Sequence, residues 1–277
     1  MIITSLQNSR VKSVVHLRRR RERDRCGKVI VEGYRELLRA RQKQYPVEEL
    51  YFCPEWFQGT NEGALLEAFQ GAGAELIEVG RDAFRKMAYR DRPEGLLGVG
   101  PQVRHTLGNL SLSTVPFLLV AEAIEKPGNL GTILRSADAT GVDGLILCDR
   151  CTDIFNPNVV RASTGTLFSV TVAEADGTQA GRWLAARGIR TVAATPHAGP
   201  LYTAVDMTGP VAIVVGTEQV GLSEQWMRAA DLQVRIPMLG MADSLNVATA
   251  TTLLLYEVVR QRGLEGVPSA RGGSVAT

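Results

Sequence analysis

An apolar run followed by a glycine-punctuated turn, within residues 116–147, most constrains how this chain can fold. The run "PFLLVA" is typical of a strand that is buried on both faces. The next stretch, "EKPGNLGTILRSADATGVDGLIL", predicts a turn, a helix and a second buried strand. This order is that of a nucleotide-binding βαβ unit, but the Gly-x-Gly-x-x-Gly fingerprint is absent. Asn129, Gly131 and Arg135 stand there instead.

The rest of the C-terminal half continues the same alternation of strongly apolar strands and helices. Such an alternation predicts an α/β domain with a parallel sheet that is covered on both faces. We place this domain at residues 117–263 and expect a disordered tail at 264–277, where apolar residues are few. The further strands are expected at "FSVTV", "IRTVAAT", "PVAIVVG" and "DLQVRIPM", and a long last helix at "LNVATATTLLLYEVVRQR".

The first hundred residues predict a smaller α/β domain at residues 1–106, followed by a linker at 107–116. A basic helix is expected to run to about Arg25, and short strands and helices then alternate up to "GLLGVG". The segment "PQVRHTLGNLSLSTVP" contains Pro, Gly, Ser and Thr and has no sustained period. It therefore separates the two domains.

Length and composition limit the class of protein. A chain of 277 residues can form two domains, and 45% hydrophobic with 22% charged residues is typical of a soluble globular protein. No apolar run approaches the roughly 20 residues that span a bilayer, and the start lacks the apolar core of a signal peptide. These features, with four cysteines, indicate a cytoplasmic protein with free thiols.

Cysteine spacing raises the question of a metal site. Cys148 and Cys151 form one CxxC pair, but there is no second pair and no histidine close by in the sequence. A structural zinc ion needs four ligands, so we expect no metal here. The simpler interpretation is a thiol at a strand end and another in a loop.

Positive charge is concentrated near the N-terminus, although the formal net charge is only +2. Residues 10–28 contain nine Lys or Arg and two acidic residues, and four of the nine are consecutive. A solvated helix face is the ordinary explanation for a charge run. Four adjacent arginines repel one another, however, and this favours contact with a phosphate backbone. The predicted contacts are Arg18, Arg19, Arg20 and Arg21.

Polar residues follow several predicted strands at the edge where open parallel sheets bind ligands. Each has a structural alternative: Asn129 or Ser244 as a helix N-cap, Glu218 as the partner of a helix N-terminus, and Gly216 or Gly221 in tight turns. Convergence of several polar groups on one crevice nevertheless indicates a site. Its candidate residues are Asn129, Arg135, Glu218, Ser244 and Asn246.

Four segments of the C-terminal half carry a resemblance to a known family. "PGNLGTILRSADATG", "RASTGTLF", "VVGTEQVGLS" and "IPMLGMADSLNVATATTLLLYE" resemble, in order, motifs of the SpoU (TrmH-like) RNA 2′-O-ribose methyltransferases of the SPOUT superfamily. The likeness covers residues 117–262. More loosely, "KVIVEGYRELLRA" and "VEELYFC" resemble the substrate-binding domain of rRNA-modifying members.

The resemblance implies a fold, a cofactor and an assembly. It implies a parallel-sheet SPOUT domain with a deep trefoil knot, beside a small αβα RNA-binding domain, in a homodimer. It also implies an S-adenosylmethionine pocket formed by the knot loops, which would explain the missing glycine fingerprint. The implied cofactor-binding residues are Thr195, Pro196, Gly216, Ile236, Met238 and Leu245.

The implied reaction is methyl transfer to a ribose 2′-hydroxyl of structured RNA, more specifically 23S-type ribosomal RNA. Arg135 would either assist deprotonation of the hydroxyl or clamp a neighbouring phosphate, and both roles stay open. Asn129 would orient Arg135, and Glu218 would position loop groups. Ser244 and Asn246 would hold the ribose or shape the cofactor loop.

The resemblance also points to two further residues near the RNA, and three other functions have to be compared with methyl transfer. Arg161 and Ser163 in "RASTGTLF" match the family and are expected near the RNA, although Arg161 could instead pair with a neighbouring helix end. A tRNA 2′-O-methyltransferase and a catalytically silent RNA-binding or ribosome assembly factor remain as alternatives. A nicotinamide oxidoreductase is disfavoured, because its glycine fingerprint and acidic ribose ligand are missing.

Overall fold

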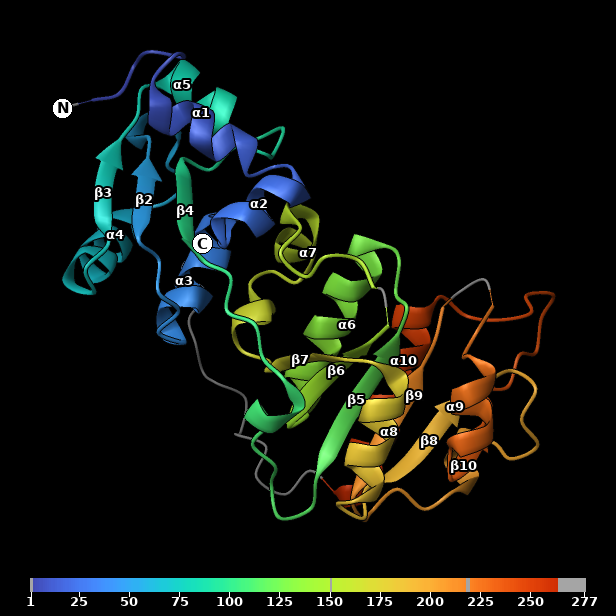
Figure 1. Cartoon of the computed structure of the whole chain (residues 1–277). Coiled ribbons are helices and arrows are strands. Elements are labelled where there is room, and N and C mark those ends of the chain that lie inside the picture. Colours follow the sequence, from blue (N-terminus) through green and yellow to red (C-terminus); the bar gives the residue numbers. More distant parts are fainter. Residues whose placement is uncertain (1, 150, 218–219, 264–277) are drawn as a thin grey trace.

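Two sheets, each covered by helices, form the protein in the computed structural model (Figure 1). The structure describes residues 2–149, 151–217 and 220–263. Glu218 and the tail predicted at 264–277 lie outside the described residues. Within the described ranges, no helix is long and apolar enough to cross a membrane.

The N-terminal sheet has four strands in the order β1-β4-β2-β3. Strands β2 and β3 are parallel, and β4 is antiparallel to both β1 and β2. Along β1 the side chains alternate: Val29 and Val31 pack with the core beneath α3 and α4, and Ile30 packs with α1 and α5. The predicted αβα layers are therefore confirmed. The elements are α1 (Ser9–His16), α2 (Arg20–Cys26), β1 (Lys28–Glu32), α3 (Tyr34–Gln42), β2 (Glu49–Phe52), η1 (Pro54–Trp56), α4 (Glu62–Gly71), β3 (Glu75–Glu78), α5 (Arg81–Met87) and β4 (Leu96–Pro101).

The prediction of one basic helix up to about Arg25 is wrong, because the segment forms two helices. The first ends at His16, and the second begins at Arg20. Between them, Arg18 turns its guanidinium to the end of α5, where Nη2 donates to the backbone oxygen of Lys86 at 2.7 Å and to that of Ala88. This tertiary contact fixes the break, and no local pattern reveals it.

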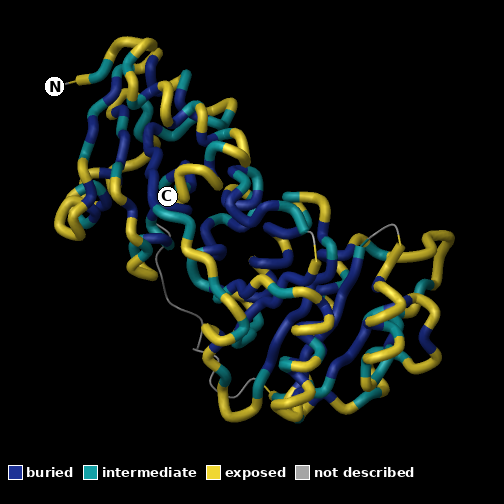
Figure 2. Tube along the Cα trace, viewed as in Figure 1, coloured by how far each residue is buried: buried dark blue, intermediate teal, exposed yellow. Residues whose placement is uncertain are grey.

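The C-terminal sheet has six strands, all parallel, in the order β10-β8-β9-β5-β6-β7. One face packs against α6, α7 and α10, the other against α8 and α9. Its central strands are buried throughout (Figure 2), as their continuous apolar runs predict. The elements are β5 (Phe117–Glu122), α6 (Pro127–Thr140), β6 (Gly144–Cys148), α7 (Pro157–Ala162), η3 (Thr166–Phe168), β7 (Val172–Ala175), α8 (Gly177–Ala185), β8 (Arg190–Ala194), η4 (Tyr202–Ala204), β9 (Val211–Val215), α9 (Glu224–Ala229), β10 (Leu232–Val234) and α10 (Val247–Arg262).

This strand order determines where loops gather. The chain leaves β5 for β6 and β7 on one side, whereas β9, β8 and β10 lie on the other. Such a reversal opens a crevice beyond the carboxyl ends of the strands. The expected strand "FSVTV" is displaced, because its first residue ends η3 and only Val172 belongs to β7. Burial of Val170 in the core explains the misleading apolar pattern. The trefoil knot stays a prediction.

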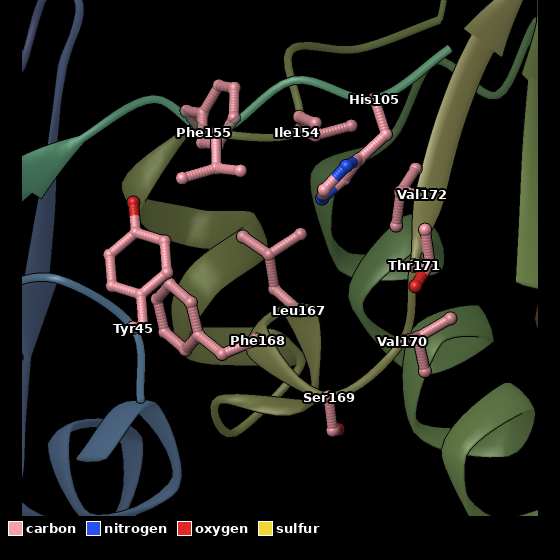
Figure 3. A pocket seen from close by; sticks show the side chains of 11 residues that line it. Tyr45, His105, Ile154, Phe155, Leu167, Phe168, Ser169, Val170, Thr171 and Val172 are labelled. Carbon is pink, nitrogen blue, oxygen red and sulfur yellow. The ribbon is translucent and has the colours of Figure 1, made fainter. Parts of the chain in front are cut away.

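Residues 102–116 connect the two sheets, and the part around His105 and Leu107–Asn109 lies along β7, the edge strand of the large sheet. His105 pairs in parallel with Ala173, and its carbonyl accepts a hydrogen bond from the backbone nitrogen of Glu174 at 3.1 Å. Figure 3 shows His105 beside a small cavity, of about 100 Å³, that Tyr45 and Phe168 also line. The boundaries 1–106, 107–116 and 117–263 stay a prediction, with an η2 turn at Leu107–Asn109 inside the linker.

Buried polar contacts join the two domains. The Arg23 side chain of α2 is 2% exposed and pairs with Asp153, which is 5% exposed, in the C-terminal domain. Arg39 of α3 donates to Oγ1 of Thr164 at 2.6 Å. The rings of Tyr45 and Phe168 add an aromatic contact, with centroids 4.4 Å apart. These contacts fix the N-terminal domain against α7, which lies beside α2 in Figure 1, and against η3, which contacts α3.

Candidate active site

A cavity of about 660 Å³ lies beyond the carboxyl ends of β8, β9 and β10, beside the start of α10. Its size is within the range of pockets that bind cofactors and other small molecules. The crevice predicted from the strand order therefore exists. All six predicted cofactor-binding residues line it, namely Thr195, Pro196, Gly216, Ile236, Met238 and Leu245.

The walls of this cavity are mainly apolar, and polar groups enter from the ends of the strands. Val215, Leu222 and Ile236 contribute apolar side chains. Thr195 is buried, and its Oγ1 accepts a hydrogen bond from the backbone nitrogen of His197 at 3.3 Å. An apolar lining with a few fixed polar groups suits a ligand that has a flat ring and a polar end.

Gly216 has a local reason to be glycine. A Cβ at this position would lie 2.6 Å from the carbonyl carbon of Gly221 and 2.6 Å from the nitrogen of Leu222. Gly221 itself has φ of +71°, which favours glycine. The tight-turn alternative thus fits Gly221, whereas Gly216 is required by the close approach of the backbone at Gly221 and Leu222, and it lines the cavity as well.

Several lining residues carry no sequence signal that would have identified them. Leu222 and Met227 come from the segment around α9, where their apolar spacing indicates only a core face. Asp243 lies directly before the candidate Ser244, and only this neighbourhood could have identified it. His197, by contrast, follows the predicted strand at residues 189–195 directly after Pro196, and this position at a strand end is a sequence signal for the site.

Asn129 and Asn246 meet where α6 and α10 begin. Asn246 is the N-cap of α10, since its Oδ1 accepts a hydrogen bond from the nitrogen of Ala248 at 3.0 Å. Its Nδ2 donates to Oδ1 of Asn129 at 3.2 Å. Asn129 lies inside α6, whose N-cap is Lys126, so the capping alternatives for Asn129 and Ser244 are both wrong. Ser244 is exposed and lines the cavity.

Arg135 projects from α6 on the side of α7. It is exposed and forms no ion pair with any residue in the described part of the chain. Gly131, four residues earlier and so on the same helix face, packs directly against α7. A Cβ on Gly131 would lie 2.8 Å from the carbonyl carbon of Ala162. Arg161, the neighbour of Ala162, is also exposed, which leaves two cations on adjacent helices open to an anionic partner.

The structure also refines the predictions for the motif around α7. Nη2 of Arg161 donates to Oδ1 of Asn158, 3.3 Å away in the same helix, so the alternative of a pairing with a neighbouring helix end is wrong. Ser163 is fully buried, and its Oγ donates to the backbone oxygen of Val160 at 2.9 Å. Ser163 therefore closes α7 and does not reach the surface, contrary to the expectation that it lies near RNA.

The run of four arginines separates into two groups. The guanidinium of Arg18 donates hydrogen bonds to backbone oxygens at the end of α5. Arg19, Arg20 and Arg21 are exposed, and Arg20 forms an exposed pair with Asp24 at 3.4 Å. The contact with phosphate predicted for this run stays a prediction, and its accessible part is the last three residues.

The two thiols of the CxxC pair lie at a strand end and in a loop, as predicted. Cys148 ends β6 and is buried, and burial raises the pKa of its thiol. Cys151 accepts a hydrogen bond from the nitrogen of Ile124 at 3.2 Å, and burial raises its pKa to about 11. Among the residues that the structure describes, no three His, Cys, Asp or Glu side chains are grouped to hold a metal ion.

Family models match both halves of the chain. Residues 116–256, more than half of the chain, match the SpoU rRNA Methylase family. The chain belongs to this family. Residues 8–98 match the MRM3-like substrate binding domain. The resemblance inferred from the motifs of both domains is thereby confirmed.

Full-length relatives agree with this membership. The chain is 31% identical to the 23S rRNA (uridine(2479)-2′-O)-methyltransferase of Streptomyces viridochromogenes, over 88% of this chain and 86% of that protein. It is 28% identical to the 23S rRNA (guanosine(2553)-2′-O)-methyltransferase RlmP of Bacillus subtilis, over 92% of this chain and 98% of that protein.

Solved structures extend the family likeness to three dimensions. The crystal structure of an RNA 2′-O ribose methyltransferase superposes with a TM-score of 0.84 at 39% identity, covering 95% of this chain and 99% of that one. An AdoMet-bound rRNA methyltransferase from Sinorhizobium meliloti superposes with a TM-score of 0.86 at 31% identity, covering 94% of this chain and 97% of that one. Both domains are thus shared with methyltransferases.

Proposed function

We propose that this protein transfers a methyl group from S-adenosylmethionine to a ribose 2′-hydroxyl of 23S-type ribosomal RNA. One observation carries the proposal: all six predicted cofactor residues line a single cavity at the strand ends. The linked pair Asn129 and Asn246, where α6 and α10 begin, agrees with it. Relatives that match nearly the whole chain are named for 23S rRNA. They favour this substrate over tRNA and over a silent assembly factor.

The cavity fits the cofactor by its chemistry. The apolar side chains of Val215, Ile236 and Met238 suit an adenine ring, and backbone groups that follow β8 and β9 suit its polar edge. Thr195 and Leu245 complete the proposed set that holds the cofactor. When bound, S-adenosylmethionine supplies an electrophilic methyl group on a sulfonium centre.

Of the groups proposed to act on RNA, Ser244 lines this cavity, and Asn246 stands in sequence between the lining residues Leu245 and Val247. A guanidinium carries no free acceptor site for a proton, so we assign Arg135 the clamping of a phosphate beside the target ribose. The bond between Asn129 and Asn246 ties α6, which carries Arg135, to the loop that contains Ser244. In this proposal Ser244 holds the ribose or shapes the cofactor loop, and Glu218 positions loop groups. Arg161 would extend the phosphate contacts on α7.

A homodimer in the cytoplasm is part of the proposal. Four apolar side chains are exposed at the C-terminal end of the domain: Leu239 and Met241 in the loop before α10, and Leu253 and Tyr256 on α10. We propose that these side chains contribute to the contact with a second copy, because exposed apolar surface that is contiguous marks an interface with another protein. Sedimentation equilibrium checks the dimer, and Tyr256→Asp should weaken it.

Two measurements test the activity. Isothermal titration with S-adenosylmethionine should show binding, and radiolabelled methyl groups should pass to 23S rRNA but not to tRNA. Mapping 2′-O-methyl positions in rRNA with and without the gene then identifies the nucleotide. Absence of cofactor binding, or label on tRNA alone, would contradict the proposal.

A further inference from the structure

A chain of hydrogen bonds runs from the N-terminal domain to Arg161 on α7. The amide nitrogen of Asn158, Nδ2, donates to the hydroxyl of Tyr89 at 2.9 Å, across the contact between the two domains. The amide oxygen of the same side chain, Oδ1, accepts from Nη2 of Arg161 at 3.3 Å. Tyr89 and Asn158 are half-buried, whereas Arg161 is exposed. A residue of the N-terminal domain is therefore connected to a cation that we propose to contact RNA.

The backbone at Tyr89 is held by two side chains of its own domain. Its nitrogen donates to Oε2 of Glu32 at 2.7 Å, and Glu32, the last residue of β1, is only 7% exposed. Arg18 donates to the backbone oxygen of Ala88, directly before Tyr89. These two contacts fix the backbone from which the Tyr89 side chain reaches Asn158 on α7.

The two ends of an asparagine amide differ in chemistry, and this difference gives Tyr89 its role. A guanidinium only donates hydrogen bonds, so Arg161 binds the oxygen of Asn158 and not its nitrogen. The Tyr89 hydroxyl accepts from the nitrogen, which turns the oxygen toward Arg161. The terminal torsion of asparagine is broad. Without the hydroxyl, nothing in this chain of hydrogen bonds distinguishes the two ends of the amide.

Arg161 lines a cavity of about 530 Å³ between the two domains, together with Arg35 of α3 and Glu62 of α4. Helix α7, which carries Arg161, also packs against α6, the helix of Arg135. A long side chain that is already ordered loses less conformational entropy when it binds its partner. Orientation of Arg161 by Asn158 therefore strengthens a phosphate contact at this place without adding a new contact.

We propose that Tyr89 is a positioning residue that orients Arg161, through Asn158, for a phosphate of the RNA substrate. The inference rests on the proposed function, which assigns Arg161 to phosphate contact. Docking of the N-terminal domain then has an effect on the C-terminal domain itself, because it orders a side chain that contacts the substrate.

Tyr89→Phe removes the hydroxyl and keeps the ring, and Tyr51→Phe is its matched control. The Tyr51 hydroxyl also makes a hydrogen bond, to Oε2 of Glu49 at 2.6 Å, but within β2. With the 23S rRNA fragment that the wild type methylates, Tyr89→Phe should raise KM about 2- to 10-fold, the effect of one hydrogen bond. Its kcat and its affinity for S-adenosylmethionine should match the wild type. Tyr51→Phe should leave all three quantities unchanged.

The double variant Tyr89→Phe/Arg161→Gln distinguishes positioning from a purely structural role. If Tyr89 acts through Arg161, the KM of the double variant should equal that of Arg161→Gln alone. Asn158→Leu removes the link between the two residues and should raise KM by a factor similar to that of Tyr89→Phe. If Tyr89→Phe fails to fold, Asn158→Leu takes its place in the comparison. An unchanged KM, or the same rise in KM with and without Arg161, would overturn the inference.

Side-chain NMR of Arg161 separates this inference from the proposed function, because it needs no RNA. The Nε–Hε group of Arg161 should show a smaller heteronuclear NOE, and so more motion, in Tyr89→Phe than in the wild type or in Tyr51→Phe. This result would support the positioning of Arg161 even if no rRNA were methylated. Methylation of rRNA by the wild type, together with the same KM and the same NOE in Tyr89→Phe, would refute the positioning role and leave the proposed function intact.

Discussion

Asp153→Ala is expected to destabilise the protein strongly, because it leaves the guanidinium of Arg23 buried without its counter-charge. The two side chains are 2% and 5% exposed and join α2 to the C-terminal domain. Removing one partner of a buried ion pair costs about 3–5 kcal/mol. The substitution also removes the hydrogen bond from the nitrogen of Phe155 to Oδ1 of Asp153, at 2.9 Å. For a chain of this length, the loss corresponds to a fall in Tm of about 6–20 °C.

Urea and thermal unfolding measure this loss, with the exposed pair Arg228 and Glu224 as the control. The side chains of that pair are 80% and 83% exposed, so Glu224→Ala should shift Tm by no more than about 1–2 °C. The double variant Arg23→Met/Asp153→Leu should recover only part of the loss. Nη1 of Arg23 also donates to the backbone oxygens of Leu17 and Arg18 at 2.9 and 2.8 Å, and methionine leaves both unpaired. A loss below about 1 kcal/mol in Asp153→Ala would refute the reasoning.

Three other outcomes follow from the structure. Arg135→Ala should keep its affinity for S-adenosylmethionine, while the rate of single-turnover methylation falls about 100- to 1,000-fold. Arg135→Lys should restore little of this rate if a bidentate clamp is needed. Near-native methylation by the alanine variant would exclude a catalytic role. Changing Arg19, Arg20 and Arg21 to Gln should lower the slope of log binding constant against log salt by roughly 0.7–0.9 per lost phosphate contact, whereas an unchanged slope would identify a solvated face. At pH 8 a thiol reagent should modify the exposed Cys26 first and Cys151 slowly. Burial raises the pKa of Cys151 to about 11, so little thiolate forms at that residue. Fast reaction of two thiols would contradict the burial.

The sequence predicted which residues meet in the cavity at the strand ends better than it predicted the contacts of individual arginines. Residues after parallel strands meet at one edge of the sheet, so Thr195 and Ile236 could be assigned to one site from strand order and motif. Arg18 and Arg23 lie in a run that looks uniform, but their partners Lys86 and Asp153 are 68 and 130 residues away. Charge patterning contains no information about such contacts.

The same limit applies to the motif around α7 and to the cavity between the domains. Ser163 matches a family motif, yet its hydroxyl is buried and closes a helix. A motif match identifies a residue type at a position, but it does not say whether that residue stabilises the fold or contacts the substrate. The cavity beside Glu62 is lined by residues of both domains. The hydrophobic periodicity within one domain predicts its helices and strands, but it does not predict how the two domains pack together.

The segment that joins the domains also has a consequence for solubility. Strand β7 lies at the border of the large sheet, and an uncovered border offers backbone donors and acceptors to any other chain. His105 occupies part of this border by pairing with Ala173. A C-terminal domain produced without residues 102–116 would therefore expose this edge strand to pairing with other chains, and it would also lose Leu110, which is buried in the core on one face of the sheet.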